Sequence, residues 1–318
     1  MSDLVTVSEL TRSFRPGPPA VDHISFSVRR GEIFSLLGPN GAGKTTTIRL
    51  LSGLIYPTSG EVRILGIVTT DSSQVEEIHN AIGLLPEVPG LYESLSAMQN
   101  LRFYGRMHSL SEATINERAR ELLAAFDIWG RRDDRVATYS KGMKQKVAIV
   151  RALLHDPECL ILDEPLSGLD PEAAKSTRDF LVDQRRRGRT VIVSTHNLDD
   201  ADRLSDRVAV IRSRLLALDT PSQLKSRLFR ARVEVRMQNG SPSVLDRVRS
   251  LPGILHASWE PPSLILELAE PESELPEVIS TLVRAGLRLQ YVTPMEHSLE
   301  DVYLKLVDDA RGRAGAGP

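Results

Sequence analysis

The segment GPNGAGKTT (Gly38–Thr46) constrains the fold of this chain more than any other stretch. It fits the phosphate-binding pattern G-x-x-x-x-G-K-[ST], follows the apolar run Ile33–Leu37 and precedes a helical pattern over Thr45–Leu54. A strand, a glycine-rich turn and a helix in this order aim free backbone N–H groups and the positive end of a helix dipole at an anion. The sequence therefore predicts a site for a nucleoside triphosphate.

Individual side chains of this loop have distinct expected roles. Lys44 supplies a positive charge to the β- and γ-phosphates, and the hydroxyl of Thr45 is placed for Mg²⁺. The glycines let the backbone wrap closely around the phosphates, because a positive φ costs them little. We expect the whole loop to contact the nucleotide: Gly38, Pro39, Asn40, Gly41, Ala42, Gly43, Lys44, Thr45 and Thr46.

A second motif, CLILDEP (Cys159–Pro165), places two carboxylates at the end of an apolar strand. In phosphate-loop ATPases the first such carboxylate, here Asp163, holds Mg²⁺ through water. The second, Glu164, is positioned to polarise the water that attacks the γ-phosphate. The same residues would also suit a turn or a helix start, but behind a phosphate loop the catalytic interpretation is favoured.

The composition is that of an ordinary globular protein. Apolar residues make up 41%, charged residues 26%, and the net charge of −2 is spread evenly, so no domain-wide basic field indicates nucleic acid. The single cysteine, Cys159, forms no internal disulfide and suits a reducing cytoplasm. The N-terminus lacks the build of a signal peptide, and the longest uncharged stretches, 33–43 and 50–60, fall short of the roughly 20 residues that span a bilayer. We expect the chain to reach any membrane through a partner.

Strand and helix patterns alternate through about residue 222, which favours a layered α/β domain. Strands are predicted at Leu4–Leu10, Ile24–Val28, Ile33–Leu37, Glu61–Ile67, Ile82–Leu85, Leu160–Leu162 and Thr190–Ser194, with a closing hairpin at Val208–Ile211 and Leu215–Leu218. Helices are predicted over residues 96–130, Lys141–Leu154 and Glu172–Arg187.

The pattern changes from Lys225 onward. Strands at Val233–Met237, Ile254–Trp259, Leu264–Leu268 and Leu287–Val292 alternate with helices near 242–251 and 274–285. This β-α-β-β-α-β order predicts a small α+β domain of ferredoxin-like topology over residues 225–310. A last helix is expected at Leu299–Val307, and the Gly/Ala-rich residues 311–318 are expected to be disordered.

Three further segments carry weaker signals when taken alone. SGLD (Ser167–Asp170) has glycine and aspartate where turns usually have them. YSKGMKQKV places Ser140 and Gly142 at the start of a helix. This helix start suits a phosphate, or it is simply the cap of a surface helix. His196 follows a buried strand beside the predicted carboxylate strand. A histidine there is more often a surface residue, but this one could reach the γ-phosphate.

In chain order, GPNGAGKTT, YSKGMKQ, LILDEP, SGLD and STH resemble the nucleotide-binding subunit of an ABC transporter. The resemblance covers residues 1 to about 222. It implies an α/β fold of the P-loop NTPase class, with a RecA-like core, an antiparallel β subdomain and a helical subdomain at about 88–157. The small ferredoxin-like domain would follow this ATP-binding domain.

The resemblance also implies roles for single residues. Glu164 would be the catalytic carboxylate, supported by Lys44 and His196, and Asp170 would belong to a loop that contacts a second subunit. Ser140 and Gly142 match the signature motif, which in this family completes the site of the opposite subunit. Phe14 matches the aromatic residue that stacks on adenine, where the family usually has tyrosine.

Two motifs depart from the family pattern. The signature motif has Lys141 in place of a glycine and Met143 in place of glutamine. Glu87 aligns with a glutamine that contacts Mg²⁺ and couples to the membrane subunit, and a carboxylate can still hold Mg²⁺ through water. Both departures and the ending EHSLEDVYLKLV (296–307) resemble export ATPases of the daunorubicin-resistance and sodium-efflux kind.

The leading hypothesis is an ATP-hydrolysing subunit of an exporter, with ATP and Mg²⁺ as ligands. It would work as a homodimer or with a homologous subunit, on the cytoplasmic face of the cell membrane, against a membrane permease encoded elsewhere. The alternative is a soluble ATPase of the same type acting on ribosomes or DNA. Such chains usually carry two cassettes, coiled-coil or zinc insertions or a basic linker, and this sequence has none of them.

Overall fold

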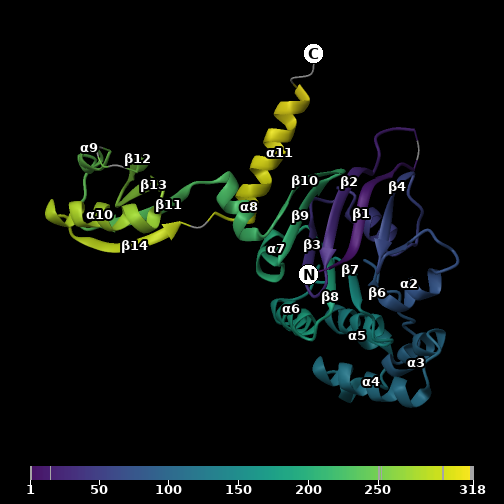
Figure 1. Cartoon of the computed structure of the whole chain (residues 1–318). Coiled ribbons are helices and arrows are strands. Elements are labelled where there is room, and N and C mark those ends of the chain that lie inside the picture. Colours follow the sequence, from purple (N-terminus) through teal and green to yellow (C-terminus); the bar gives the residue numbers. More distant parts are fainter. Residues whose placement is uncertain (1, 15, 250, 252, 296, 316–318) are drawn as a thin grey trace. The chain divides into compact units, whose positions relative to one another are not determined.

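The computed structural model describes residues 2–14, 16–249, 251, 253–295 and 297–315, with side chains to 309. The chain divides into two compact units, Met1–Pro221 and Ser222–Pro318 (Figure 1). None of the helices in the described part is long and apolar enough to cross a membrane.

A six-stranded sheet forms the centre of the first unit, in the order β10-β9-β3-β8-β7-β6. Neighbours from β9 to β6 run parallel, and β10 closes the edge antiparallel to β9. The central strands read as continuous apolar runs because both faces of the sheet are covered. The strands are β3 (Ile33–Leu37), β6 (Ile82–Leu85), β7 (Cys159–Asp163), β8 (Thr190–Thr195), β9 (Arg207–Arg212) and β10 (Arg214–Asp219).

An antiparallel sheet and the first helix share one hydrophobic core with one face of the central sheet. The sheet has the order β2-β1-β4-β5, with β1 (Asp3–Arg12), β2 (Val21–Arg29), β4 (Ser59–Ile64) and β5 (Ile67–Val68). The predicted single strand over 61–67 is wrong, because Leu65 and Gly66 both have positive φ (55° and 83°) and turn the chain into a hairpin. Helix α1 (Lys44–Leu51) adds Ile48 and Leu51 to this core.

Helices cover the opposite face of the central sheet. Alternation along β7 puts Leu160 and Leu162 into this second core, while Cys159 and Ile161 face the first. The predicted helical stretch 96–130 is two helices, α3 (Ala97–Met107) and α4 (Glu112–Ala125), followed by a short 3-10 helix at Trp129–Arg131. Both pack with α5 (Lys141–Leu153), which in turn packs with α6 (Pro171–Arg186), as Figure 1 shows. Two shorter helices, α2 (Val75–Ala81) and α7 (Leu198–Leu204), complete the unit.

The second unit has the β-α-β-β-α-β order that the sequence predicts. Its antiparallel sheet runs β12-β13-β11-β14, built from β11 (Ala231–Met237), β12 (Ile254–Glu260), β13 (Ser263–Leu268) and β14 (Leu289–Met295). Helices α9 (Val244–Val248) and α10 (Pro271–Arg284) supply Val244, Val248, Val278 and Leu282 to the core of this unit. This is the ferredoxin-like strand order.

Two helices flank the ferredoxin-like sheet in the sequence. Helix α8 (Pro221–Leu228) precedes it, and α11 (Leu299–Gly315) follows it. Helix α11 continues beyond the predicted end at Val307 into the segment expected to be disordered, and residues 316–318 lie outside the described part of the chain.

Candidate functional site

The carboxyl ends of three neighbouring parallel strands gather the predicted catalytic residues. β3 and β8 are paired from Ile33↔Val191 to Leu37↔Thr195, and Asp163 at the end of β7 pairs with Ser194. The loop Gly38–Thr46, the carboxylates after β7 and His196 after β8 therefore leave the sheet at one edge. Open α/β sheets bind ligands outside this edge.

The phosphate loop is tightly packed against the rest of the unit at two of its glycines. A Cβ on Gly38 would lie 2.4 Å from the Ile211 oxygen, and one on Gly43 would lie 2.4 Å from the Ala20 oxygen. Gly43 also has a φ of 96° and directly precedes α1. Any larger residue at these two positions would displace the loop, so its shape is fixed before a ligand binds.

Lys44 is buried and bridges the loop to the carboxylate strand. Its Nζ donates to the carbonyl oxygens of Gly38 (2.8 Å) and Pro39 (3.2 Å). The same ammonium lies 3.2 Å from Glu164 Oε1, an ion-pair distance without hydrogen-bond geometry. Thr45 and Thr46 follow in the first turn of α1, each half-buried. The loop thus presents one buried cation and the start of a helix to a ligand.

Glu164 lies between Lys44 and His196, the two residues expected to support it. Its Oε2 is 2.9 Å from His196 Nδ1, while its other oxygen faces Lys44. Glu164 also adopts a positive φ of 51°, a conformation that costs a non-glycine residue free energy and often marks a functional site. Its backbone N–H is held by Ser194, through the hydroxyl (3.0 Å) and the carbonyl oxygen (3.2 Å).

Ser194 is a site residue that the sequence analysis missed. It is fully buried, and its hydroxyl donates to Asp163 Oδ1 and accepts from the N–H of Glu164. One side chain therefore holds the carboxylate of Asp163 and the backbone of Glu164. The available signal was its place in STH, near the end of the strand that neighbours β7. A buried serine in a strand, however, does not indicate a chemical role from the sequence alone.

The donor set at this edge fits Mg²⁺ bound together with a phosphate. Asp163 is buried at the strand end, and Glu164 Oε1 is a buried oxygen without a hydrogen-bond donor among the described residues. The hydroxyl of Thr45 is half-exposed beside the loop. No three histidine, cysteine or carboxylate side chains of the described residues converge as a metal cage, and Mg²⁺ needs none, because it is usually held by one or two carboxylates, waters and phosphates.

The signature residues lie on a different element from this cluster. Ser140 caps α5 by accepting from the N–H of Met143 (3.2 Å) and is exposed, while Gly142 is buried against Ala173. Asp170 caps α6 by accepting from the N–H of Ala173 (2.8 Å). No hydrogen bond or ion pair within the described part of the chain joins Ser140 or Asp170 to the Lys44–Glu164–His196 cluster.

Lys141, the departure from the signature motif, packs on the loop before α6. A Cβ on Gly168 would lie only 2.1 Å from Lys141 Nζ, and Gly168 has a φ of 65°. The long side chain therefore occupies space over a glycine that has no side chain of its own. Further along α5, Gln145 Nε2 donates to the carbonyl oxygen of Pro165 (3.0 Å). Helix α5 thus touches the segment that follows Glu164 at two points.

The remaining two predicted residues are solvent-facing. Phe14 is 56% exposed, and the guanidinium of Arg12 lies 4.7 Å from its ring centroid on one face. Glu87 is exposed two residues after β6, and none of the described residues forms a hydrogen bond or ion pair with it. The structure therefore leaves both available to a ligand without bringing them to Glu164.

This chain is similar to known proteins in sequence and in fold. The family model described as ABC transporter matches residues 21–167. The fluoroquinolones export ATP-binding protein Rv2688c of Mycobacterium tuberculosis is 40% identical over 74% of this chain and 76% of its own length. The chain belongs to the ABC transporter ATP-binding proteins. It is therefore an ATP-binding, ATP-hydrolysing protein of the transport ATPase class.

Two further relatives of this ABC ATPase bear on both units. The daunorubicin/doxorubicin resistance ATP-binding protein DrrA of Streptomyces peucetius is 33% identical over 91% of the chain and 88% of its own length, so the likeness extends into the second unit. A solved dimeric ATP-binding cassette, described as a post-hydrolysis state bound to ADP and Pi, matches with a TM-score of 0.63 at 25% identity. It covers 68% of this chain and 98% of that structure.

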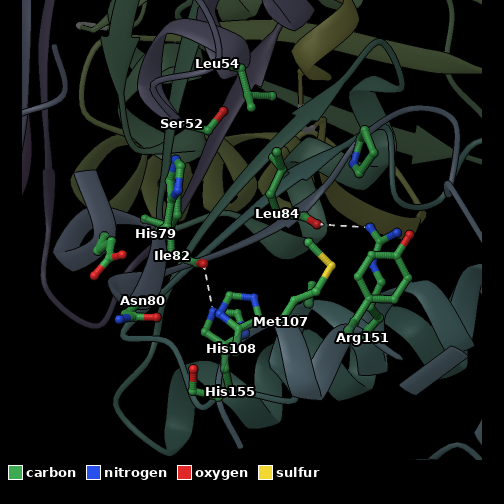
Figure 2. Close-up of a pocket in the computed structure, with 15 residues that line it drawn as sticks. Ser52, Leu54, His79, Asn80, Ile82, Leu84, Met107, His108, Arg151 and His155 are labelled. Atoms are coloured by element: carbon green, nitrogen blue, oxygen red, sulfur yellow. Dashed lines mark hydrogen bonds between the residues drawn. The ribbon is translucent and has the colours of Figure 1, made fainter. Parts of the chain in front are cut away.

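A separate cavity of about 580 Å³ lies in the first unit of this ABC ATPase, between β6 and the helices α3 and α5 (Figure 2). Its lining includes His79, His108, His155 and Arg151. The rings of His108 and His155 stack in parallel with centroids 3.9 Å apart. Burial, and then the neighbouring His108, lower the pKa of His155 to about 4, and burial also lowers the pKa of His108. Both imidazoles are therefore neutral at pH 7.

Proposed function

We propose that this ABC ATPase is the ATP-hydrolysing subunit of an exporter and drives a separate membrane permease from the cytoplasmic face of the membrane. The observation that carries the proposal is the contact of Glu164 with both Lys44 and His196 at the ligand-binding edge of the sheet. The relatives whose names refer to drug export and resistance support the exporter assignment.

The roles of the residues follow from their chemistry. Glu164 accepts a proton from the attacking water, and Lys44 and His196 stabilise charge that develops on the transferred γ-phosphoryl group. Ser194 keeps Glu164 in its strained conformation. Lys44 donates to the carbonyl oxygens of Gly38 and Pro39, and phosphate oxygens would accept from the same ammonium when ATP binds.

Magnesium is part of the proposal. Asp163, Thr45 and Glu87 are the residues that would hold it, and when bound it neutralises negative charge on the phosphates. Ser194 fixes the carboxylate of Asp163 for this role. On the adenine side, Phe14 offers one ring face, because Arg12 lies over the other.

The proposal includes a dimer of two such subunits, because the signature residues do not reach the cluster of their own chain. Ser140 is exposed at the start of α5, an arrangement suited to a phosphate of a second copy's ATP. Asp170 lies beside this helix start, where a Cβ on Gly142 would be 3.9 Å from its carboxylate. The dimeric state of the related solved cassette supports this reading.

A surface on the helical part of the first unit is suited to the permease. Four exposed apolar side chains gather on α3 and the segment before it, namely Val88, Tyr92, Phe103 and Met107, with exposed fractions of 75%, 47%, 42% and 69%. The rings of Tyr92 and Phe103 pack edge to face, 5.1 Å apart. Clustered exposed apolar side chains of this kind usually mark an interaction site.

The test places a photo-crosslinking amino acid at Phe103, with Tyr56, an aromatic that is 61% exposed elsewhere in the first unit, as the matched control. Irradiation of cells from the native host should link position 103, and not position 56, to a polytopic membrane protein. The chain should also sediment with membranes only when that protein is present. Linkage of position 103 to ribosomal proteins or DNA would favour the soluble alternative and contradict the exporter.

A further inference from the structure

Two basic side chains of helix α5 bind the segment 84–93, which carries Glu87. Near the start of the helix, Lys144 Nζ pairs with Glu93 Oε1 at 2.6 Å. In its last turn, Arg151 donates from one terminal nitrogen to the carbonyl oxygens of Pro89 (2.6 Å) and Gly90 (3.3 Å). The other terminal nitrogen donates to Leu84 (3.3 Å), as Figure 2 shows. One guanidinium thus ties three carbonyl groups of this segment to the helix.

Arg151 forms these bonds at an energetic cost. Burial lowers the pKa of its guanidinium, and no carboxylate in the described part of the chain pairs with it. Its plane lies over the ring of Tyr104, 4.9 Å from the centroid, and the Tyr104 hydroxyl donates to the same Gly90 oxygen (2.7 Å). A partly buried arginine without a counter-ion needs another source of compensation, which the carbonyl dipoles provide. These bonds hold the segment 84–90 in a fixed position beside α5.

The other end of α5 belongs to the nucleotide site under the proposed function. Ser140 and Gly142 start the helix, and Gln145 donates to the carbonyl oxygen of Pro165, next to Glu164. A helix of this length spans about 20 Å and moves as a unit, since its backbone bonds are internal. Helix α5 therefore joins the signature residues, the segment after Glu164 and the segment around Glu87.

We propose that Arg151 is a positioning residue for ATP hydrolysis. Through Leu84, Pro89 and Gly90 it makes the segment that carries Glu87 follow α5 when ATP engages Ser140. The inference rests on the proposed function for the roles of Glu87 and Ser140. Arg151 donates to backbone carbonyl groups of residues 84–90 and acts through this backbone.

The experiment compares the full-length Arg151→Met protein with Arg118→Met. Arg118 is a matched control because it also donates to a carbonyl oxygen near the end of α5, that of Leu154 (3.0 Å), but makes no bond to segment 84–93. With MgATP, we expect Arg151→Met to lower kcat about tenfold and to leave the Kd for ATP within about threefold, because the phosphate loop is untouched. Arg118→Met should leave both constants within about twofold.

Hydrogen–deuterium exchange at residues 84–93 supplies a readout that a general loss of stability would not reproduce. In the wild type, exchange there should slow when MgATP is added. In Arg151→Met it should be fast and unchanged by ATP, while β3 and α1 still respond. Normal ATP-dependent protection of 84–93 in Arg151→Met, or a kcat within twofold of wild type, would overturn the proposal.

Two milder variants decide the matter if Arg151→Met does not fold. Tyr104→Phe removes only the hydroxyl bond to Gly90 and should give the same exchange pattern with a kcat reduced about twofold to threefold. Arg151→Lys keeps a donor and should fall between wild type and Arg151→Met. Normal protection in both would contradict the inference. A wild-type chain that fails to close into a dimer with MgATP would count against the proposed function. A wild-type dimer that forms normally, together with normal protection of 84–93 in Arg151→Met, would count against the role of Arg151 alone.

Discussion

The two sheets that organise the two units place their loops differently. In the six-stranded parallel sheet, β3, β7 and β8 all end at one edge, so residues as distant in sequence as Lys44 and His196 both reach Glu164. In the antiparallel sheet of the second unit, neighbouring strands end at opposite edges. Polar side chains there pair across strands, as Ser263 does with Glu234 (2.5 Å). The first arrangement builds a reactive site, and the second stabilises a sheet.

The largest effect should come from Glu164→Gln. Loss of the general base should reduce kcat about a thousandfold, while the Kd for ATP stays within about threefold, because the phosphate loop is intact. Steady-state hydrolysis and equilibrium nucleotide binding measure the two constants. The matched variant in the other sheet, Glu234→Gln, should leave kcat within twofold. Hydrolysis by Glu164→Gln above a tenth of the wild-type rate would exclude it as the base.

A core substitution in the second unit should separate stability from activity. Leu266 is fully buried on β13, so Leu266→Ala should lower the free energy of unfolding of this unit by about 2–4 kcal/mol. We expect kcat to stay within twofold at 25 °C. The counterpart Ile161→Ala, on the buried strand β7, should lower both stability and kcat. Chemical denaturation with limited proteolysis resolves the units, and a kcat that falls with Leu266→Ala would tie the second unit to the site.

The stacked histidines predict a smaller, pH-dependent effect. The pKa of His155 is about 4 in the folded chain against roughly 6.5 when unfolded, so its neutral form stabilises the fold above pH 6.5. This contribution is lost as the pH falls from 6.5 towards 4 and amounts to about 2 kcal/mol, allowing for partial exposure. His155→Gln should flatten the stability profile in this window, and the exposed His79→Gln should not. Parallel profiles for His155→Gln and wild type would contradict the assignment.

Much of the first unit was predictable because its signals are local. The loop Gly38–Thr46 and the pair Asp163 and Glu164 have fixed spacing, and the strands around them are uninterrupted apolar runs. The ferredoxin-like order of the second unit also followed from alternation. Such patterns depend only on which faces of an element are buried.

Features set by tertiary contacts were not predictable. Helices α2, α7 and α8 are seven or eight residues long and too short for a clear helical period. Ser194 gained its role from the strand beside it, and Arg151 gained its carbonyl partners from a segment more than sixty residues earlier in the chain. Neither the composition nor the spacing of motifs indicates which distant residues become the neighbours of Ser194 and Arg151.

The composite site between two copies is the central claim, and the mass of the ATP-bound species tests it most directly. Light scattering on the Glu164→Gln protein should show a monomer without nucleotide and a dimer with MgATP. Adding Ser140→Ala should abolish the dimer while ATP binding to each monomer persists, because in the proposed function Ser140 serves the partner's nucleotide. A dimer that survives Ser140→Ala unchanged, or a Glu164→Gln protein that stays monomeric with ATP, would contradict the account.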